Sequence, residues 1–383
     1  MRGSGGTGWL RGGVLIGALL LLCGCTLSNA LRQDDYYSVW NRGPTPPRTV
    51  FFATDRETGS ADFSLSWGAS LHCGRAAISI PAVWASGPVP LTQTQSCDTG
   101  AELTRFAGGI ASAAREKHCN SVLIFVHGAN TTFRTAMMQG AQLSLDTAWP
   151  CAVLVFSWSS EGKFDRYLAD VEHSGYAVPQ LTAVMRALVA AGLKVDVIAH
   201  SVGSRVAMSA LGAACGEPAP LADQLLLVAP DVGAQPGNDD FGHLLRRDAP
   251  CVGRATLYAS DNDLALITSR GVHGGVPRAG QLFDARYPGL DVVDATLALS
   301  DSSGHGYLTL SYETAGDMMW ALSGASLQRR TAPPASTLTC SDTGDARCAD
   351  GKGHYALAVA PARRPDLGAR LLRHIWPLIL PVQ

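Results

Sequence analysis

Short apolar runs alternate with longer amphipathic segments along most of the chain. Each run is rich in valine, leucine, isoleucine or phenylalanine and has the length of one strand buried on both faces. The segments between them, such as Thr132 to Thr147 and Gln180 to Ala191, space their apolar residues as a helix does. The runs predict strands at Thr49–Thr54, Ala76–Val83, Ser121–Val126, Ala152–Phe156, Val195–Ala199, Leu225–Ala229, Ala255–Ala259 and Leu290–Ala295. Because strands and helices alternate, we expect an α/β fold with a mostly parallel central sheet and helices on both faces.

Glycine and proline mark where this alternation is interrupted. Between the first two predicted strands the chain is rich in glycine and serine, which we interpret as turns. A helix is predicted from Leu103 to Ala114, where apolar residues recur at helical spacing. Pro179 is expected either to open the helix that follows it or to kink that helix.

The N-terminal segment has the pattern of an export signal. Its apolar run from Val14 to Leu22 follows basic residues and is too short to span a bilayer. The run ends in Leu22-Cys23-Gly24-Cys25, which resembles a bacterial lipobox, so we expect removal of residues 1–24 and lipidation of Cys25. This predicts a protein of the bacterial cell envelope, lipid-anchored at the outer membrane or the periplasmic face. Cleavage near Asn29-Ala30 is the alternative and would give a soluble periplasmic protein.

The rest of the chain divides by composition. Residues 25–48 are polar and rich in proline, which predicts a tether. Residues 49–324 hold the α/β alternation and are assigned to one domain. Residues 325–383 form a C-terminal extension that we expect to pack on this domain. Its last part, Arg363 to Leu380, is predicted to be a helix, with contact to a membrane as the alternative.

Composition and charge narrow the class of protein. The chain has 383 residues, of which 46% are hydrophobic and 16% charged, so it has enough apolar material for a large core. Its formal net charge is −2, and lysine and arginine are scattered rather than gathered in a stripe. We therefore expect no nucleic-acid partner.

One serine lies in a sharp turn between a predicted strand and a predicted helix, in the segment Ala199-His200-Ser201-Val202-Gly203. Small residues two positions either side of it let strand and helix pass closely, so that the serine stands clear of the sheet. The general pattern of such a nucleophile elbow is G-x-S-x-G, and here Ala199 takes the place of the first glycine. An ordinary turn with Ser201 as a helix cap is the alternative.

Polar residues follow other predicted strands, at the carboxyl edge where ligands bind a parallel sheet. The segments are His127-Gly128-Ala129-Asn130, Ser260-Asp261-Asn262-Asp263 and, further downstream, Ser303-Gly304-His305-Gly306. The backbone N–H groups of Ala129 and Val202 are expected to face the elbow and form an oxyanion hole. The chain order of the candidate groups is serine, acid, histidine.

This order, with a histidine-glycine turn upstream of the elbow, resembles the α/β-hydrolase superfamily over roughly Thr49 to Gly324. More closely, FVHGAN, FSWSS, AHSVGSRV, VAPD, YASDNDLAL and GHGYL look like an uncharacterised bacterial branch of esterase- or lipase-like proteins. The resemblance implies an α/β-hydrolase fold with Ser201 as nucleophile and His305 as general base and then acid. It also implies that Asp263 orients His305, and it implies no substrate.

Neighbouring residues leave alternatives for several of these roles. Asp231 and Asp261 also follow predicted strands, and either could be the acid in place of Asp263. His127 and His200 are expected to brace the two loops through hydrogen bonds. Three aromatic residues are candidates either for an acyl pocket or for the rim of the core: Trp158, Phe164 and Tyr167.

Other motifs are missing from the sequence. Gly162-Lys163 lacks the remaining residues of a phosphate-binding loop, and no spacing of cysteine and histidine fits a zinc site. We therefore expect neither a metal nor a cofactor.

The cysteines predict disulfides. Setting aside the two in the lipobox leaves 10 − 2 = 8, an even number in a chain expected to reach an oxidising compartment. Cys119 and Cys151 precede strands that lie side by side in the resembled fold, and Cys215 and Cys251 meet by the same argument. The predicted pairs are Cys73–Cys97, Cys119–Cys151, Cys215–Cys251 and Cys340–Cys348. Reduced, buried thiols are the alternative.

Two kinds of function fit the sequence. The first is an exported serine hydrolase that cleaves an ester, or a thioester or amide, of a small-molecule or acyl-ester substrate through an acyl-enzyme. The second is a non-catalytic envelope lipoprotein that keeps the fold as a binding or scaffolding module. With either function, we expect the protein to bind a membrane through its N-terminal lipid anchor in addition to binding its substrate or ligand.

Overall fold

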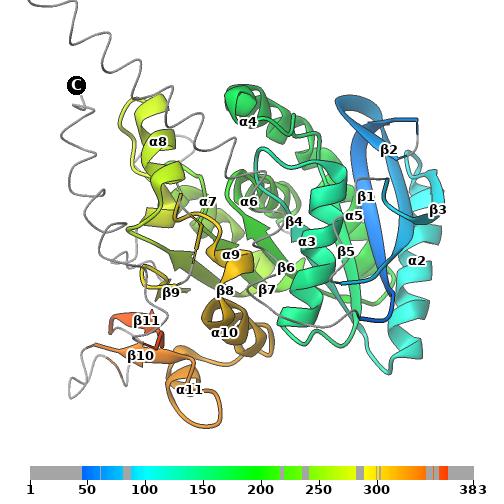
Figure 1. Cartoon of the computed structure of the whole chain (residues 1–383). Coiled ribbons are helices and arrows are strands. Elements are labelled where there is room, and N and C mark those ends of the chain that lie inside the picture. The colour runs from blue at the N-terminus through cyan, green and yellow to red at the C-terminus, as the bar shows by residue number, and fades with distance from the viewer. Residues whose placement is uncertain are drawn as a thin grey trace, which may run out of the picture.

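A single 11-stranded sheet runs through the molecule in the order β10-β11-β9-β8-β7-β6-β4-β5-β1-β2-β3 (Figure 1). The computed structural model describes residues 45–360, except 61, 81–87, 216–219, 235–240, 282–288, 299, 302, 342–347 and 349–352. All neighbours from β11 to β1 pair in parallel, and the antiparallel pairs lie at the two ends of the sheet. The mostly parallel sheet is thus confirmed.

The described strands are β1 Arg48–Thr58, β2 Phe63–Ile78, β3 Leu91–Ser96, β4 Ser121–Val126, β5 Ala152–Ser157, β6 Lys194–His200, β7 Ala222–Val228, β8 Val252–Ala259, β9 Leu290–Asp294, β10 Leu338–Cys340 and β11 Tyr355–Leu357. The described helices are α2 Gly100–Glu116, α3 Phe133–Asp146, α4 Tyr167–Tyr176, α5 Val178–Ala190, α6 Val202–Ala214, α7 Phe241–Asp248, α8 Leu264–Val272, α9 Tyr307–Leu310, α10 Tyr312–Leu322 and α11 Leu327–Thr331. Short 3₁₀ helices are Phe164–Arg166, Ala249–Cys251 and Ala279–Gln281.

The central strands are apolar throughout because their side chains alternate between two cores. In β4, Val122 and Ile124 belong to the core on one face of the sheet, while Leu123 and Phe125 belong to the core on the other. Helices α2, α5, α6 and α7 cover the first face, and α3, α9 and α10 cover the second, in front of the sheet in Figure 1. This is the predicted arrangement of helices on both faces.

Local sequence signals set the helix ends. Thr99 and Glu102 form a capping box that opens α2, and the Thr132 side chain caps α3 by accepting from the Thr135 N–H. Pro179 lies in the first turn of α5, where it costs no hydrogen bond. It therefore opens the helix and does not kink it.

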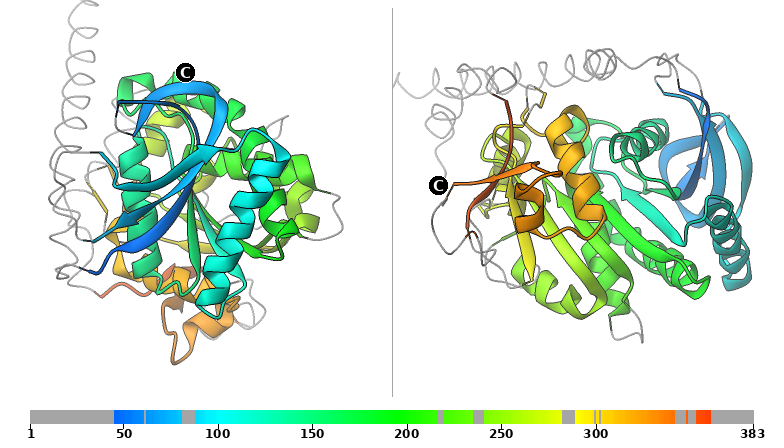
Figure 2. Two further views of the ribbon diagram at one scale, coloured as in Figure 1. Left: turned by 90° about the vertical axis from the view of Figure 1, so that its right-hand side faces the viewer. Right: turned by 90° about the horizontal axis from the view of Figure 1, so that it is seen from below.

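The interpretation of turns between the first two predicted strands is wrong. Residues Phe63–Ile78 form the 16-residue β2, which pairs antiparallel with β1 in a long curved hairpin (Figure 2). Its middle is exposed and contains serine and glycine, so composition alone hides it. Backbone pairing with β1 supplies the hydrogen bonds of β2 whatever its side chains are. Strand β3 pairs with β2 and is also largely exposed, so its sequence shows no strand pattern either.

The C-terminal extension takes part in the sheet. Strands β10 and β11 pair antiparallel, and β11 adds to β9 at the end of the sheet remote from the β1–β2 hairpin (Figure 2). The described part of the extension is therefore continuous with the domain. The predicted signal peptide, the lipidation site Cys25, most of the tether and the predicted helix Arg363–Leu380 lie outside the described residues. No helix within the described ranges is long and apolar enough to cross a membrane.

Disulfide bonds are confirmed. The structure contains the four pairs that the sequence predicts, with Cα atoms between 5.4 and 6.3 Å apart: Cys73–Cys97, Cys119–Cys151, Cys215–Cys251 and Cys340–Cys348. Cys119 and Cys151 meet because β4 and β5 are parallel neighbours, and each cysteine precedes its strand. Such bonds persist in oxidising compartments, so they indicate an extracytoplasmic protein.

Candidate active site

Ser201 lies at the turn between β6 and α6 with φ 52° and ψ −126°. A left-handed φ costs a non-glycine residue about 1–3 kcal/mol and persists only where the surroundings hold it. Here the Ser201 N–H donates to the Val228 carbonyl at 3.0 Å, and the Ser201 carbonyl accepts from the Asp231 N–H at 3.1 Å. The end of β7 and the loop after it thus hold the strained turn.

Close packing explains the small residues around this turn. A Cβ on Gly203 would lie 2.6 Å from the Val126 carbonyl oxygen and would overlap that of His127. A Cβ on Gly128 would lie 2.9 Å from the Cβ of Ser201. Ala199 is fully buried, so the elbow accepts a methyl group in place of the first glycine of the general pattern.

His305 and Asp263 form a close pair at the same edge of the sheet. His305 Nδ1 lies 2.6 Å from Asp263 Oδ2, and Asp263 is fully buried while the His305 side chain is 16% exposed. Asp263 also caps α8, since its Oδ1 accepts from the Leu266 N–H at 2.9 Å. Burial raises the pKa of Asp263, and the neighbouring His305 opposes this rise. One carboxylate therefore serves both as the helix cap and as the partner of the imidazole.

The loop that carries His305 is held by hydrogen bonds to the carboxylate of Asp301, which lies in the same loop. The Asp301 carboxylate accepts from the backbone N–H of His305 at 3.2 Å and from the Ser303 hydroxyl at 2.6 Å. Tyr307, two residues on, is fully buried and donates from its hydroxyl to the Tyr258 carbonyl at 3.0 Å. These bonds anchor the loop on both sides of the imidazole.

Ser201 and His305 are neighbours but are not bonded to each other. The ring of His200, the residue before Ser201, lies 4.7 Å from the His305 ring between centroids, and its Nε2 lies 3.3 Å from the His305 carbonyl oxygen. Across the described residues, no hydrogen bond joins the Ser201 hydroxyl to His305. The hydroxyl is also largely covered, since Ser201 is 7% exposed.

The loop from His127 to Thr131 lies against the elbow and is held along its length. Trp158 Nε1 donates to the His127 carbonyl at 2.8 Å, His127 Nδ1 lies 2.7 Å from the Gly128 carbonyl oxygen, and the Asn130 N–H donates to Asp170 at 2.8 Å. Among the bonds of the described residues, none uses the N–H of Ala129 or of Val202, the first residue of α6. These are the two groups predicted to form the oxyanion hole.

The two alternative acids are engaged elsewhere. Asp231 accepts from Arg278 at 2.6 Å, from Ser269 at 2.7 Å and from the Tyr167 hydroxyl at 2.6 Å. The side chain of Asp261 is exposed, and its backbone N–H donates to Thr296. Of the three candidates it is Asp263 that contacts His305.

Neighbouring aromatic and histidine residues support the loops. His127 is fully buried and stacks on Trp158 with ring centroids 5.1 Å apart. Burial, with Arg56 nearby, lowers the pKa of His127 to about 3, so this imidazole stays neutral. Trp158 is likewise fully buried and belongs to the core, and the Tyr167 hydroxyl bonds to Asp231. Trp158 therefore does not line an open acyl pocket, whereas a place for the partly buried Tyr167 in such a pocket stays a prediction, and the Phe164 side chain lies outside what the structure describes.

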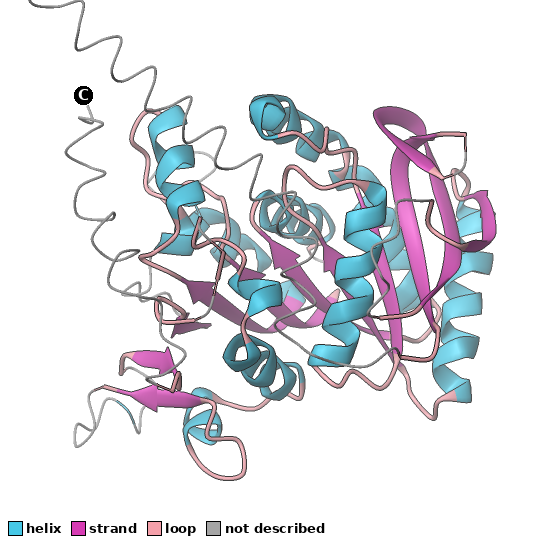
Figure 3. Ribbon diagram, viewed as in Figure 1, coloured by secondary structure: helices cyan, strands magenta, loops and turns pink. Residues whose placement is uncertain are grey.

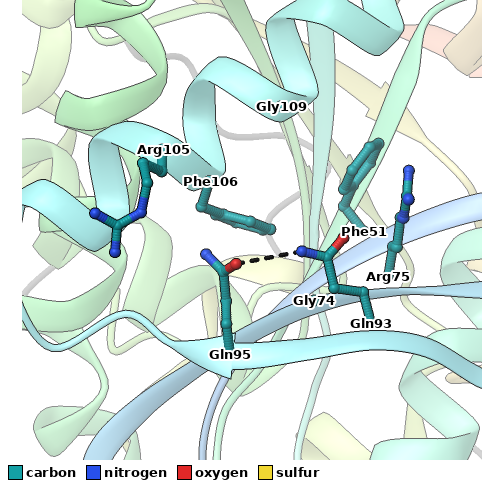
Figure 4. A pocket seen from close by; sticks show the side chains of 8 residues that line it. All are labelled: Phe51, Gly74, Arg75, Gln93, Gln95, Arg105, Phe106 and Gly109. Carbon is teal, nitrogen blue, oxygen red and sulfur yellow. Dashed lines mark hydrogen bonds between the residues drawn. The ribbon is translucent and has the colours of Figure 1, made fainter.

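Two small cavities lie apart from this site. One of about 80 Å³ lies between β2, β3 and α2, and its glutamines Gln93 and Gln95 bond to each other at 3.3 Å (Figure 4). The other, of about 200 Å³, lies beside the end of β2 and α3. No candidate site residue lines either cavity. No cluster of three or more metal-ligating side chains occurs in the described part of the chain.

Comparison with known proteins yields one family. A family model described as an alpha/beta hydrolase of unknown function (DUF900) matches residues 106–305. The match begins within α2 and ends at His305, so it includes the elbow, the loop from His127 to Thr131, and Asp263. No curated protein matches the chain.

Proposed function

Because the chain belongs to the family of alpha/beta hydrolases of unknown function (DUF900), we propose that it is a serine hydrolase that cleaves esters through an acyl-enzyme. The observation that carries the proposal is the 2.6 Å pair of His305 and buried Asp263 beside a strained serine turn. The arrowheads of the central strands point toward one edge of the sheet (Figure 3). The pair lies at this edge, because Asp263 follows β8 and caps α8.

The reaction has two halves, acylation and deacylation, and the same catalytic groups act in both. Ser201 Oγ attacks the ester carbonyl carbon while His305 Nε2 takes the hydroxyl proton, and the carbonyl oxygen becomes an oxyanion. The Ala129 and Val202 N–H groups donate to that oxyanion. The C–O bond to the alcohol then breaks, and His305 returns the proton to the leaving alkoxide. Water repeats the sequence on the acyl-enzyme, releasing the acid and free Ser201.

Asp263 stabilises the positive charge that His305 acquires. Its buried carboxylate lies on the Nδ1 side of the ring, so Nδ1 carries a proton and Nε2 is free to act as base. The Ser201 hydroxyl must turn toward Nε2 when substrate binds. Catalytic hydrogen bonds often tighten only in the complex with substrate, so the absence of this bond in the free protein is compatible with the mechanism.

The test is labelling and turnover with a graded series of p-nitrophenyl esters. Wild-type protein should react with a fluorophosphonate probe at Ser201 and hydrolyse at least one ester, thioester or amide. Ser201→Ala and His305→Ala should each lose several orders of magnitude in kcat, on the order of 10⁴ or more. Asp263→Ala should lose less, because it orients the base and does not itself react.

Asp231→Ala is the comparison variant, since the acid's contacts with Arg278 and Tyr167 put it outside the proposed triad, and its folding is checked first by urea unfolding because the variant leaves Arg278 buried without its carboxylate. A larger loss in Asp231→Ala than in Asp263→Ala would move the acid to the loop after β7. Full activity and labelling in Ser201→Ala would refute the mechanism. A wild-type protein that neither reacts with the probe nor turns over any ester would instead favour a non-catalytic binding or scaffolding module.

The proposed location is the bacterial cell envelope, with lipid on Cys25 anchoring the protein at the outer membrane or the periplasmic face. Its support is the lipobox-like Leu22-Cys23-Gly24-Cys25 together with four disulfides. A soluble periplasmic form, cleaved near Asn29-Ala30, is the alternative.

A further inference from the structure

Asp170, on α4, is a fully buried carboxylate outside the proposed triad. Its Oδ2 accepts from the Asn130 N–H at 2.8 Å and from the Ser160 hydroxyl at 2.7 Å, and its Oδ1 accepts from the Glu161 N–H at 2.7 Å. Both oxygens are thus used, and one of their donors is the backbone of the loop that carries the predicted oxyanion hole. A buried charge is tolerated only when it is paired and hydrogen-bonded in this way.

A positive charge, that of the fully buried Arg56, acts on this carboxylate, although Arg56 interacts more strongly with Asp55. Arg56 donates to the Thr131 carbonyl at 2.7 Å and to the Ser160 carbonyl at 2.9 Å. Ser160 Oγ in turn accepts from the Thr131 N–H at 3.0 Å. Asp170, Ser160 and Arg56 therefore hold consecutive backbone groups of Asn130 and Thr131.

The orientation of the Ala129 N–H depends on the two peptide units beside it. Because a peptide unit is planar, this N–H points away from the Gly128 carbonyl oxygen, which His127 Nδ1 holds at 2.7 Å. The next peptide unit is fixed by the bond from the Asn130 N–H to Asp170. Asn130 itself has φ 52°, a left-handed value that needs such support. His127 thus anchors one side of Ala129 and Asp170 anchors the other.

Helix α4 also connects this loop to the elbow. Tyr167, at the start of α4, donates to Asp231 at 2.6 Å, and the Asp231 N–H donates to the Ser201 carbonyl at 3.1 Å. The same short helix therefore supports both backbone segments that would contact the oxyanion.

We infer that Asp170 is a positioning residue that sets the direction of the Ala129 N–H through its bond to Asn130. This rests on the proposed function, because the N–H matters only if an oxyanion forms at Ser201. Asp170 touches no substrate; it acts through the loop. Its removal should therefore weaken binding of the transition state more than binding of the ground state.

The experiment compares Asp170→Ala and Ser160→Ala with Ser174→Ala in the full chain. Ser174 is the matched control, since it is buried on α4 and, within the part of the chain that the structure describes, its hydroxyl bonds only to the Val171 carbonyl of its own helix. Each variant is assayed for kcat and KM on the best p-nitrophenyl ester and for Ki of a trifluoromethyl ketone, which adds to serine and forms an oxyanion.

Losing one oxyanion donor costs about 10²–10³ in kcat, and a misdirected donor should cost part of that. Asp170→Ala is therefore expected to lower kcat by about 10- to 100-fold, with KM within about twofold and Ki raised in proportion to the loss in kcat/KM. Ser160→Ala, which removes one donor to Asp170 and the acceptor of Thr131, should show the same pattern at about three- to tenfold. Ser174→Ala should match the wild type.

Asp170→Asn provides rescue, because its amide oxygen can still accept from the Asn130 N–H while the Glu161 bond is lost. Its kcat should recover to within about fivefold of the wild type. If Asp170→Ala does not fold, Ser160→Ala and Asp170→Asn decide the question. Unchanged kcat and Ki in the folded variants, or losses that Ser174→Ala shares, overturn the inference. Failure of the proposed function would look different, because the wild type itself would neither turn over ester nor bind the ketone.

Discussion

Replacing Gly203 by alanine tests how closely the start of α6 packs against the end of β4 and the loop that follows it. The new Cβ would overlap the His127 carbonyl oxygen and lie 2.6 Å from the Val126 carbonyl oxygen. Both obstacles are backbone atoms, so no side chain can turn aside to make room. Either the start of α6 moves away from β4, or the loop after β4 moves away from Ser201.

The size of the effect follows from this geometry. Forcing an extra methyl group into a packed interior costs about 1–3 kcal/mol, and rigid backbone neighbours put this site at the upper end. A displacement of about 1 Å between the loop and the elbow also separates the predicted oxyanion donors from Ser201, which can cost about 10²-fold in rate. We therefore expect Gly203→Ala to lose both stability and turnover.

Gly109→Ala is the control, since Gly109 is an exposed residue within α2 and a Cβ there meets no atom within 4 Å. Alanine should raise the unfolding free energy there by about 0.5–1 kcal/mol, because glycine is unfavourable inside a helix. The measurement is urea unfolding of both variants with kcat on the best ester. A Gly203→Ala protein with wild-type stability and turnover would refute the reasoning about close packing in the elbow.

Three other predictions concern pH, disulfides and the anchor. Burial and the neighbouring Asp223 raise the pKa of Asp196 from 3.8 to about 7, so the folded protein holds this proton more tightly than the unfolded chain. The unfolding free energy should consequently fall as pH rises from about 4 to about 7, and Asp196→Asn should flatten this dependence in thermal unfolding across that range. The double variant Cys119→Ser with Cys151→Ser opens a 32-residue link and should cost about 2–4 kcal/mol by urea unfolding, while Ser201 still reacts with the probe. Cys25→Ala should move the protein from the membrane fraction to the soluble fraction, and an unmodified mature terminus near Leu31 in mass spectrometry would contradict lipidation.

The central sheet could be predicted because its strands are buried on both faces. Runs such as Ser121–Val126 are apolar after their first residue, as a strand buried on both faces demands, and the structure places β4 at the same bounds. The strands at the ends of the sheet could not be predicted in this way. Strands β2 and β3 are exposed over much of their length, and β10 and β11 are three residues each, so neither length nor periodicity distinguishes them from turns.

Candidate site residues at strand ends could be predicted for a geometric reason. Parallel strands end at one edge, so residues just after them are brought together whatever the helices do. The structure accordingly brings His305 to Asp263, although 42 positions separate them in sequence. The order of the strands does not distinguish Asp263 from Asp231, because both residues follow strands. Their side-chain contacts do, since Asp263 pairs with His305 and Asp231 pairs with Arg278.

The support of the loop after β4 is the part that sequence could not provide. Asp170 lies 40 positions from Asn130 on a helix, and its direction is set by how α4 packs and not by any strand end. Nothing in its local pattern separates it from a solvent-exposed aspartate, since α4 has few buried residues and Leu168 beside it is 64% exposed. A buried carboxylate that accepts from backbone N–H groups is recognised only once the fold is known. The residues that would react could thus be predicted from strand order, whereas those that direct them depend on helix packing that the sequence pattern does not determine.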